Sequence, residues 1–172
     1  MHVVTSGWLL GAPSGANTRL LALLRAMGAL LLPDERITVL HRPDYAPPRI
    51  HDRIGWHSIA VPPGPTWRRV AAERRLLAHT LQHLGANVLD HGFLPTPEVP
   101  CPVVLTIHDL RDVDGQGRRP STLARWLVRR SALRAHTVLV PSAFTAGRLR
   151  AVAPQANRSE EHTSELQSPC NL

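Results

Sequence analysis

Apolar residues in this chain fall into two patterns, short continuous runs and longer segments with apolar positions three or four residues apart. The short runs predict strands at Val3–Ser6, Ile37–Leu40, Ile59–Val61, Val88–Asp90, Val103–Ile107 and Val138–Val140. The spaced segments predict helices over residues 17–31, 66–84, 121–135 and 142–151. Strands that alternate with helices are typical of an α/β fold, so we predict a doubly wound, mainly parallel sheet.

Turn and capping residues mark the ends of these elements. The loop Gly11–Gly15 opens the first helix, and the prolines between Pro43 and Pro48 exclude regular structure there. Thr66 is a candidate cap for a helix that ends at Gly85, and Ser121 is a candidate start for the next helix.

The carboxyl-terminal segment differs in composition from the rest of the chain. Residues 158–168, RSEEHTSELQS, match the translation of a common sequencing-library adapter. We therefore expect residues 158–172 to be a disordered tail of artefactual origin that does not pack, although a natural, flexible polar tail would have the same composition. Residues 1–157 fit one domain on the usual prior of roughly 100–200 residues.

Charge and cysteine content narrow the class of protein. Every basic residue is Arg, and residues 1–157 hold 19 of the 20 arginines but 10 of the 13 acidic residues. The absence of Lys is typical of a GC-rich genome, so codon usage explains part of this positive charge. Cys101 and Cys170 provide neither a disulfide framework nor a cysteine-based metal site. No signal peptide or membrane span is evident, and we expect a cytoplasmic protein.

Two predicted strands end in polar residues. The run Pro102–Leu110 reads PVVLTIHDL, and the run Val138–Thr145 reads VLVPSAFT. Ligands of open α/β sheets bind at the carboxyl ends of the strands. A site is therefore expected near His108 and Ser142.

These segments also carry a family resemblance. The order of TIHDL, an Arg-rich helix and PSAFT is similar to the amino-terminal domain of glycosyltransferase family 4 enzymes, as are GAPSG at residues 11–15 and NVLDHGFLP at residues 87–95. The resemblance implies an incomplete, acceptor-side domain with the Rossmann-like sheet of the GT-B fold. It also implies a retaining transferase that uses a nucleotide-sugar donor, an unknown acceptor and no further cofactor.

In that family most of the donor pocket, including a pair of glutamates in an E-x7-E pattern, belongs to a carboxyl-terminal domain. The sequence stops before such a domain. We therefore expect the polypeptide as written to be catalytically inactive.

The loop before the first helix is a candidate phosphate or substrate site, to which we assign Gly11, Ser14, Gly15 and Asn17. A helix amino terminus offers N–H groups and partial positive charge to an anion. The spacing fits neither a dinucleotide fingerprint nor a P-loop. From the residues alone, a plain turn capped by Ser14 is the favoured interpretation, and the resemblance reverses that preference.

His108 and Asp109 are the candidate catalytic residues. A His at a strand end can form a hydrogen bond with a sugar hydroxyl, and the resemblance places His108 beside the transferred sugar. Asp109 would orient the loop. The alternative is a His satisfied within the loop and an Asp that caps a turn.

Ser142 and Thr145 lie at a predicted helix start, where they would cap the helix or contact acceptor or phosphate. We assign both to substrate binding and favour capping for Thr145.

His91 departs from the Asp-x-x-His pattern of many family members, which leaves its role open. His79 and His83 have a spacing that can bind metal, but no third ligand is evident, and we predict no metal site.

Six arginines surround one predicted helix, at positions 118, 119, 125, 129, 130 and 134. Such a face could contact an anionic membrane, where each charge is worth about 1 kcal/mol. A solvated face in an Arg-rich protein is the simpler interpretation, and we favour it. Nucleic acid is a weaker candidate, because aromatic residues make up only 4% of the chain.

Two other functional classes remain open from the residues. A nicotinamide-dependent oxidoreductase would need a tighter glycine fingerprint, although Asp34 and Glu35 lie about where its acidic residue is expected. The other class is a non-catalytic binding domain with a basic face.

Overall fold

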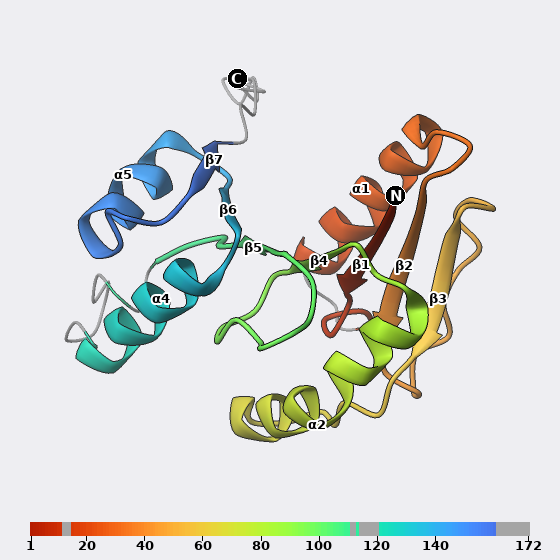
Figure 1. Cartoon of the computed structure of the whole chain (residues 1–172), viewed down its shortest axis with the longest axis horizontal. Helices are drawn as coiled ribbons and strands as arrows, with labels where there is room; N and C mark the ends of the chain where they lie inside the picture. Colours follow the sequence, from red (N-terminus) through yellow and green to blue (C-terminus); the bar gives the residue numbers. More distant parts are fainter. Residues whose placement is uncertain (12–14, 111–112, 114–120, 161–172) are drawn as a thin grey trace, which may run out of the picture. The chain divides into compact units, whose positions relative to one another are not determined.

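The computed structural model describes residues 1–11, 15–110, 113 and 121–160, without the side chains of residues 16 and 158–160. Its contacts group the chain into two compact units. Unit 1 comprises Met1–His91 and Pro97–Val103, and unit 2 comprises Gly92–Thr96 and the residues from Val104 onward. Figure 1 shows the elements of both.

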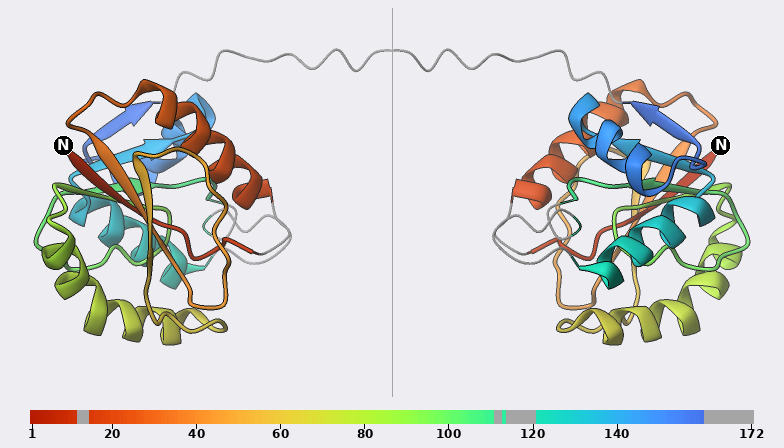
Figure 2. Two further views of the ribbon diagram at one scale, coloured as in Figure 1. Left: turned by 90° about the vertical axis from the view of Figure 1, so that its right-hand side faces the viewer. Right: turned by 90° about the vertical axis from the view of Figure 1, so that its left-hand side faces the viewer.

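Unit 1 contains four parallel strands in the order β3-β2-β1-β4. Its elements are β1 (His2–Ser6), α1 (Gly15–Leu30), β2 (Arg36–His41), β3 (Ile54–Ser58), α2 (Thr66–Leu84) and β4 (Val88–His91). Val4 in the centre of the sheet pairs with Thr38 on one side and Leu89 on the other. The connections from β1 to β2 and from β3 to β4 run in opposite directions, and right-handed crossovers then put α1 and α2 on opposite faces, as Figures 1 and 2 show.

Unit 2 contains three parallel strands in the order β5-β6-β7. Its elements are β5 (Val103–Thr106), α4 (Thr122–Arg134), β6 (Thr137–Val140), α5 (Ala143–Val152) and β7 (Arg158–Glu160). Both connections run in the same direction, so α4 and α5 lie on the same side of the strands and contact each other. The core between helices and strands includes Leu105, Val128, Val138 and Leu149.

The predicted fold class is confirmed, because the strands are parallel and alternate with helices in the Rossmann-like manner. One predicted strand is wrong. Ile59 and Val61 are buried, but the strand lies earlier, at Ile54–Ser58. It forms the edge of the unit 1 sheet and pairs through its backbone with β2, so its exposed Gly55 and half-buried His57 give no apolar run.

The predicted tail also differs from the structure in its first residues. Arg158–Glu160 forms β7 and pairs in parallel with Val138–Val140 of β6. A strand at a sheet edge needs only backbone N–H and C=O groups, so a polar segment can occupy it. Residues 161–172 of the predicted tail lie outside the described residues.

The helix ends are capped as predicted at α4 and differently at α2. Ser121 accepts a hydrogen bond from the Ala124 N–H at 3.1 Å and so caps α4. Thr66 is the first residue of α2 rather than its cap, and the preceding Pro65 makes no side-chain bond to the helix. Within the described residues, no helix is long and apolar enough to cross a membrane.

Gly7 follows β1 at a point where two backbones approach closely. Its N–H donates to the carbonyl oxygen of Leu40 at 2.8 Å. A Cβ at this position would lie 2.8 Å from the same oxygen and 2.5 Å from Cδ1 of Leu10. Only glycine therefore fits without moving the turn that leads to Leu10.

We expect Gly7→Ala to lower the free energy of unfolding by about 2 kcal/mol, because the added methyl group overlaps a backbone oxygen and a buried side chain. Urea denaturation followed by circular dichroism measures this change. Gly15→Ala is the matched control, since a Cβ there meets nothing within 4 Å and alanine favours helix. Equal stability of the two variants would contradict the close approach at Gly7.

Candidate functional site

The carboxyl ends of β1 and β4 bring Ser6 and His91 together in unit 1. The two strands are neighbours, with Thr5 opposite Asp90 in the register. Ser6 Oγ lies 2.9 Å from Nδ1 of His91, and the His91 side chain is fully buried. Two polar side chains at the strand ends of this unit are thus buried in its core.

A buried carboxylate lies next to this pair. Glu73 of α2 accepts hydrogen bonds from both its own helix and the loop after β1: Arg69 Nη1 donates at 2.7 and 2.8 Å to its two oxygens, and Trp8 Nε1 donates at 2.8 Å. Its Oε1 lies 4.0 Å from Nε2 of His91. Glu73, Trp8 and His91 are all less than 5% exposed. We call Ser6, Trp8, Arg69, Glu73 and His91 the buried network.

Burial controls the protonation of this network. Desolvation, with a further contribution from the Arg69 charge, lowers the pKa of His91 to about 3, so its ring is neutral at physiological pH. Desolvation also raises the pKa of Glu73, while the bonds from Arg69 and Trp8 favour its charged form. The two short contacts from Arg69 to the carboxylate of Glu73 form an ion pair. His91 is neutral and adds no charge to this pair.

The buried network holds the start of the loop that was predicted to bind phosphate. Trp8 is fixed by Glu73, and Gly11 is exposed with φ +87°, a conformation that favours glycine. Gly15 is exposed at the first position of α1, and Asn17 is half-buried in its first turn. Ser14 lies outside the described residues. The structure therefore places Gly15 at the start of α1 and Gly11 in the loop that follows β1.

In unit 2, His108 and Asp109 follow β5 and are both exposed, between the buried Ile107 and Leu110. The Ile107 N–H donates to the carbonyl oxygen of Leu139 at 2.9 Å, which fixes the backbone just before His108. A Cβ at Gly92 would lie 4.0 Å from Nε2 of His108, so the loop after β4 passes close to the imidazole.

Ser142 and Thr145 come together at the start of α5. Ser142 Oγ accepts a hydrogen bond from the Thr145 N–H at 3.2 Å and lies 3.1 Å from Thr145 Oγ1. The capping role therefore belongs to Ser142, not to Thr145 as favoured from the sequence. Thr145 is 8% exposed, so its hydroxyl supports the cap from within the core.

The remaining histidine candidates, His79 and His83, lie on α2. The rings of His79 and His83 lie parallel on the exposed side of α2, with centroids 6.5 Å apart. Among the described residues, no group of three or more His, Cys, Asp or Glu could hold a metal ion.

Sequence reasoning missed the buried network apart from His91. Arg69 and Glu73 have the i, i+4 spacing of an ordinary exposed helix pair, and nothing in the sequence marked them as buried. The signal available in the sequence was a Gly followed by Trp8 directly after the predicted strand Val3–Ser6. In the structure the Trp8 indole is buried.

Comparisons with known proteins agree with this arrangement. The sequence model of Glycosyltransferase Family 4 matches residues 13–159. No curated protein matches the chain. Among solved structures, the chain is similar to sucrose-phosphate synthase from Thermosynechococcus elongatus, with a TM-score of 0.71 and 11% identity over 93% of this chain and 47% of that one.

A second similar structure is a UGT transferase from Siraitia grosvenorii in complex with UDP. Its TM-score is 0.54 at 13% identity, over 91% of this chain and 50% of that one. The chain thus spans about half the length of the solved structures that it matches.

We expect Glu73→Gln to lower the free energy of unfolding by about 3 kcal/mol, because it removes the buried carboxylate that forms an ion pair with the largely buried Arg69 guanidinium. Urea denaturation measures the loss. Asp52→Asn is the control, because it removes the acidic charge from an exposed ion pair with Arg49 at 2.8 Å, and its effect should be negligible. A loss no larger than that of the control would show that the pair at Glu73 does not stabilise the fold.

The lowered pKa of His91 predicts acid sensitivity. In the unfolded chain His91 binds a proton below its ordinary pKa of 6.5, whereas in the folded chain it stays neutral down to about pH 3. The free energy of unfolding therefore falls as the pH decreases from 6.5 to about 3. Between about pH 7 and pH 5, we expect the free energy of unfolding of His91→Asn to fall by about 2 kcal/mol less than that of wild type.

Denaturation curves at several pH values test this dependence. His2 has a lowered pKa and adds a contribution of the same sign, while the raised pKa of Glu73 opposes it. Both groups are present in wild type and in the variant, so the difference reports His91. His79→Gln, which removes an exposed imidazole, serves as the control for the loss of one His.

Proposed function

The chain belongs to glycosyltransferase family 4, and on this premise we propose that it is the amino-terminal, acceptor-side part of a retaining glycosyltransferase. The complete enzyme would move a sugar from a nucleotide-sugar donor to an acceptor. The family match over residues 13–159 carries the proposal, because it includes His108, Asp109 and Ser142.

His108 is the side chain that we propose to contact the transferred sugar. It is exposed just after β5, and a neutral or protonated imidazole can form a hydrogen bond with a sugar hydroxyl. Gly92 beside it presents no side chain to the ring. Such a bond contributes to catalysis where it is stronger in the transition state than with bound substrate. Asp109, the next residue, would orient this loop.

The start of α5 supports a role in acceptor or phosphate binding. The first turn of this helix has no acidic residue, so the partial positive charge of its amino terminus is not offset there. Ser142 Oγ accepts the Thr145 N–H and retains a second lone pair. We propose the same role for Gly11, Ser14, Gly15 and Asn17 at the start of α1, where α1 likewise has no acidic residue in its first turn.

The donor would bind mainly outside this chain. The chain covers about half of the similar solved structures, one of which holds UDP. We propose that a carboxyl-terminal domain supplies most of the nucleotide-sugar pocket, that no other cofactor takes part, and that the isolated chain transfers no sugar. The absence of a disulfide framework is consistent with a cytoplasmic location.

Genomic DNA read across the codon for Asn157 tests the proposal first. We expect the reading frame to continue into a second α/β domain with an E-x7-E pattern. In the protein completed in this way, we expect His108→Ala to lower kcat about 100-fold, because one transition-state hydrogen bond is lost. Release of the nucleotide from labelled nucleotide sugars measures turnover.

The matched control is His79→Ala, which removes an exposed imidazole from α2 and should leave kcat unchanged. Circular dichroism checks that both variants fold. Sugar transfer by the isolated chain would refute the proposed inactivity. Unchanged kcat in the His108 variant would refute its contact with the sugar.

A further inference from the structure

One face of α4 exposes apolar side chains among arginines. Leu123, Trp126 and Leu133 are 70%, 55% and 44% exposed. Together with Arg130 they are spaced by three, four and three residues, which places them on one side of the helix. The opposite side, with Val128 and Ala132, is buried in the unit 2 core.

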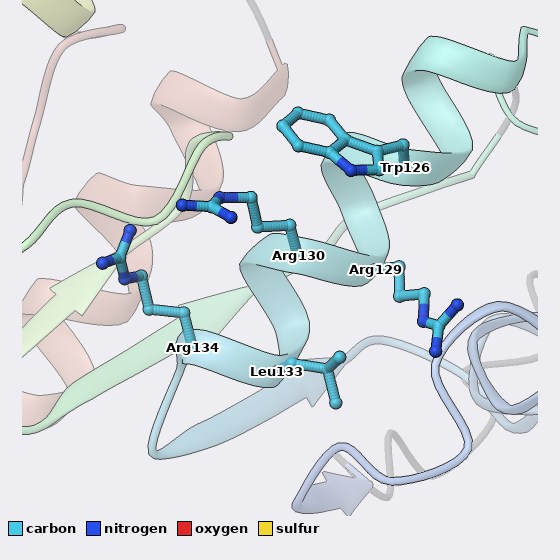
Figure 3. A pocket seen from close by; sticks show the side chains of 5 residues that line it. All are labelled: Trp126, Arg129, Arg130, Leu133 and Arg134. Carbon is cyan, nitrogen blue, oxygen red and sulfur yellow. The ribbon is translucent and has the colours of Figure 1, made fainter.

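Figure 3 shows how the side chains of this face lie. Trp126, Arg129, Arg130, Leu133 and Arg134 line an open hollow on the surface of α4. Trp126, Arg130 and Arg134 extend to one side of the helix, and Arg129 extends to the other. The Arg130 guanidinium carbon lies 5.6 Å from the Trp126 ring centroid, within cation–π range. We call Leu123, Trp126, Arg129, Arg130, Leu133 and Arg134 the α4 face.

The charge around this face is segregated. Between residues 115 and 159 the sequence has nine arginines and no acidic residue, whereas residues 1–114 have eleven arginines and ten acidic residues. Codon usage acts along the whole chain and cannot confine the excess to one part of it. The positive charge of this segment, which includes α4, therefore requires another explanation.

The composition of the α4 face identifies the kind of partner. Arginines attract an anionic surface, and Trp at the boundary between polar and apolar regions is typical of the membrane interface. Exposed leucines gain free energy only where an apolar phase accepts them, which phosphate backbones and nucleobases do not provide. An amphipathic helix that is basic and carries Trp and Leu is typical of interfacial membrane binding.

We propose that the α4 face docks on the surface of an anionic phospholipid bilayer, with Leu123, Trp126 and Leu133 inserted at the headgroup level and the arginines on lipid phosphates. This inference does not depend on glycosyl transfer, because it rests on exposure and charge alone. Binding should weaken as salt is added, since ions screen the arginine charges.

Co-sedimentation with vesicles tests the proposal on the full chain. We expect binding to vesicles that contain phosphatidylglycerol and none to phosphatidylcholine alone. R129Q/R130Q should weaken binding about 25-fold, because each charge near an anionic surface contributes about fivefold. W126A should weaken it about tenfold through lost apolar burial.

Unit 1 offers matched controls on α2. Trp67 is 66% exposed, and the guanidinium carbon of Arg68 lies 5.3 Å from the centroid of its ring. W67A therefore removes a similarly exposed Trp beside an Arg from another helix. R74Q/R75Q likewise removes an adjacent, exposed arginine pair. Both controls should bind vesicles as wild type does. Circular dichroism of every variant separates lost binding from lost folding.

Three results would overturn the proposal. The first is no binding to anionic vesicles. The second is an equal loss in the α2 controls, which would show attraction by total charge alone. The third is binding to double-stranded DNA that depends on Arg129 and Arg130 while vesicle binding does not. Quenching of Trp126 fluorescence by brominated lipid, retained in W67A and lost in W126A, would support insertion directly.

Discussion

The carboxyl ends of neighbouring parallel strands lie on the same edge of a sheet, and this constraint positions the candidate side chains of each unit. In unit 1 it brings Ser6 and His91 from β1 and β4 into hydrogen-bond distance. In unit 2, β5 and β6 pair with Thr106 opposite Leu139, so the strand-end residues His108 and Ser142 follow on one edge. The backbone ladder sets the register of the strands and so brings these side chains to one edge.

The two units use this edge differently. In unit 1 the strand ends are enclosed, and Glu73 from α2 connects to the loop after β1 through Trp8. A carboxylate so deeply buried is tolerated because Arg69 and Trp8 satisfy it, which also fixes where α2 and the loop lie relative to each other. In unit 2 His108 remains exposed at the strand end, and only exposed groups can contact substrate. The same strand-end position is thus buried in unit 1 and exposed in unit 2.

Periodicity predicted the elements with a strong apolar signal and failed where the backbone alone makes the structure. Helices α1, α4 and α5 follow from apolar spacing and capping residues, and the buried β2 follows from its apolar run. The strands β3 and β7 were missed because each pairs through peptide groups that every sequence has. The buried network was missed for a related reason. Spacing shows which residues can pair on a helix, but burial depends on what packs over them, which is a tertiary property.

The distribution of charged residues along the chain likewise becomes informative only when it is compared with the structure. In unit 1 some arginines form ion pairs with acidic groups, as in Arg69–Glu73 and Arg42–Asp44. Between residues 115 and 159 the sequence has nine arginines and no acidic residue. A net charge calculated over the whole chain hides this difference and supports a merely solvated Arg-rich surface. The exposed Trp126 and Leu133 lie beside those arginines, so this face combines positive charge with a group of apolar side chains, a combination that solvation alone does not require.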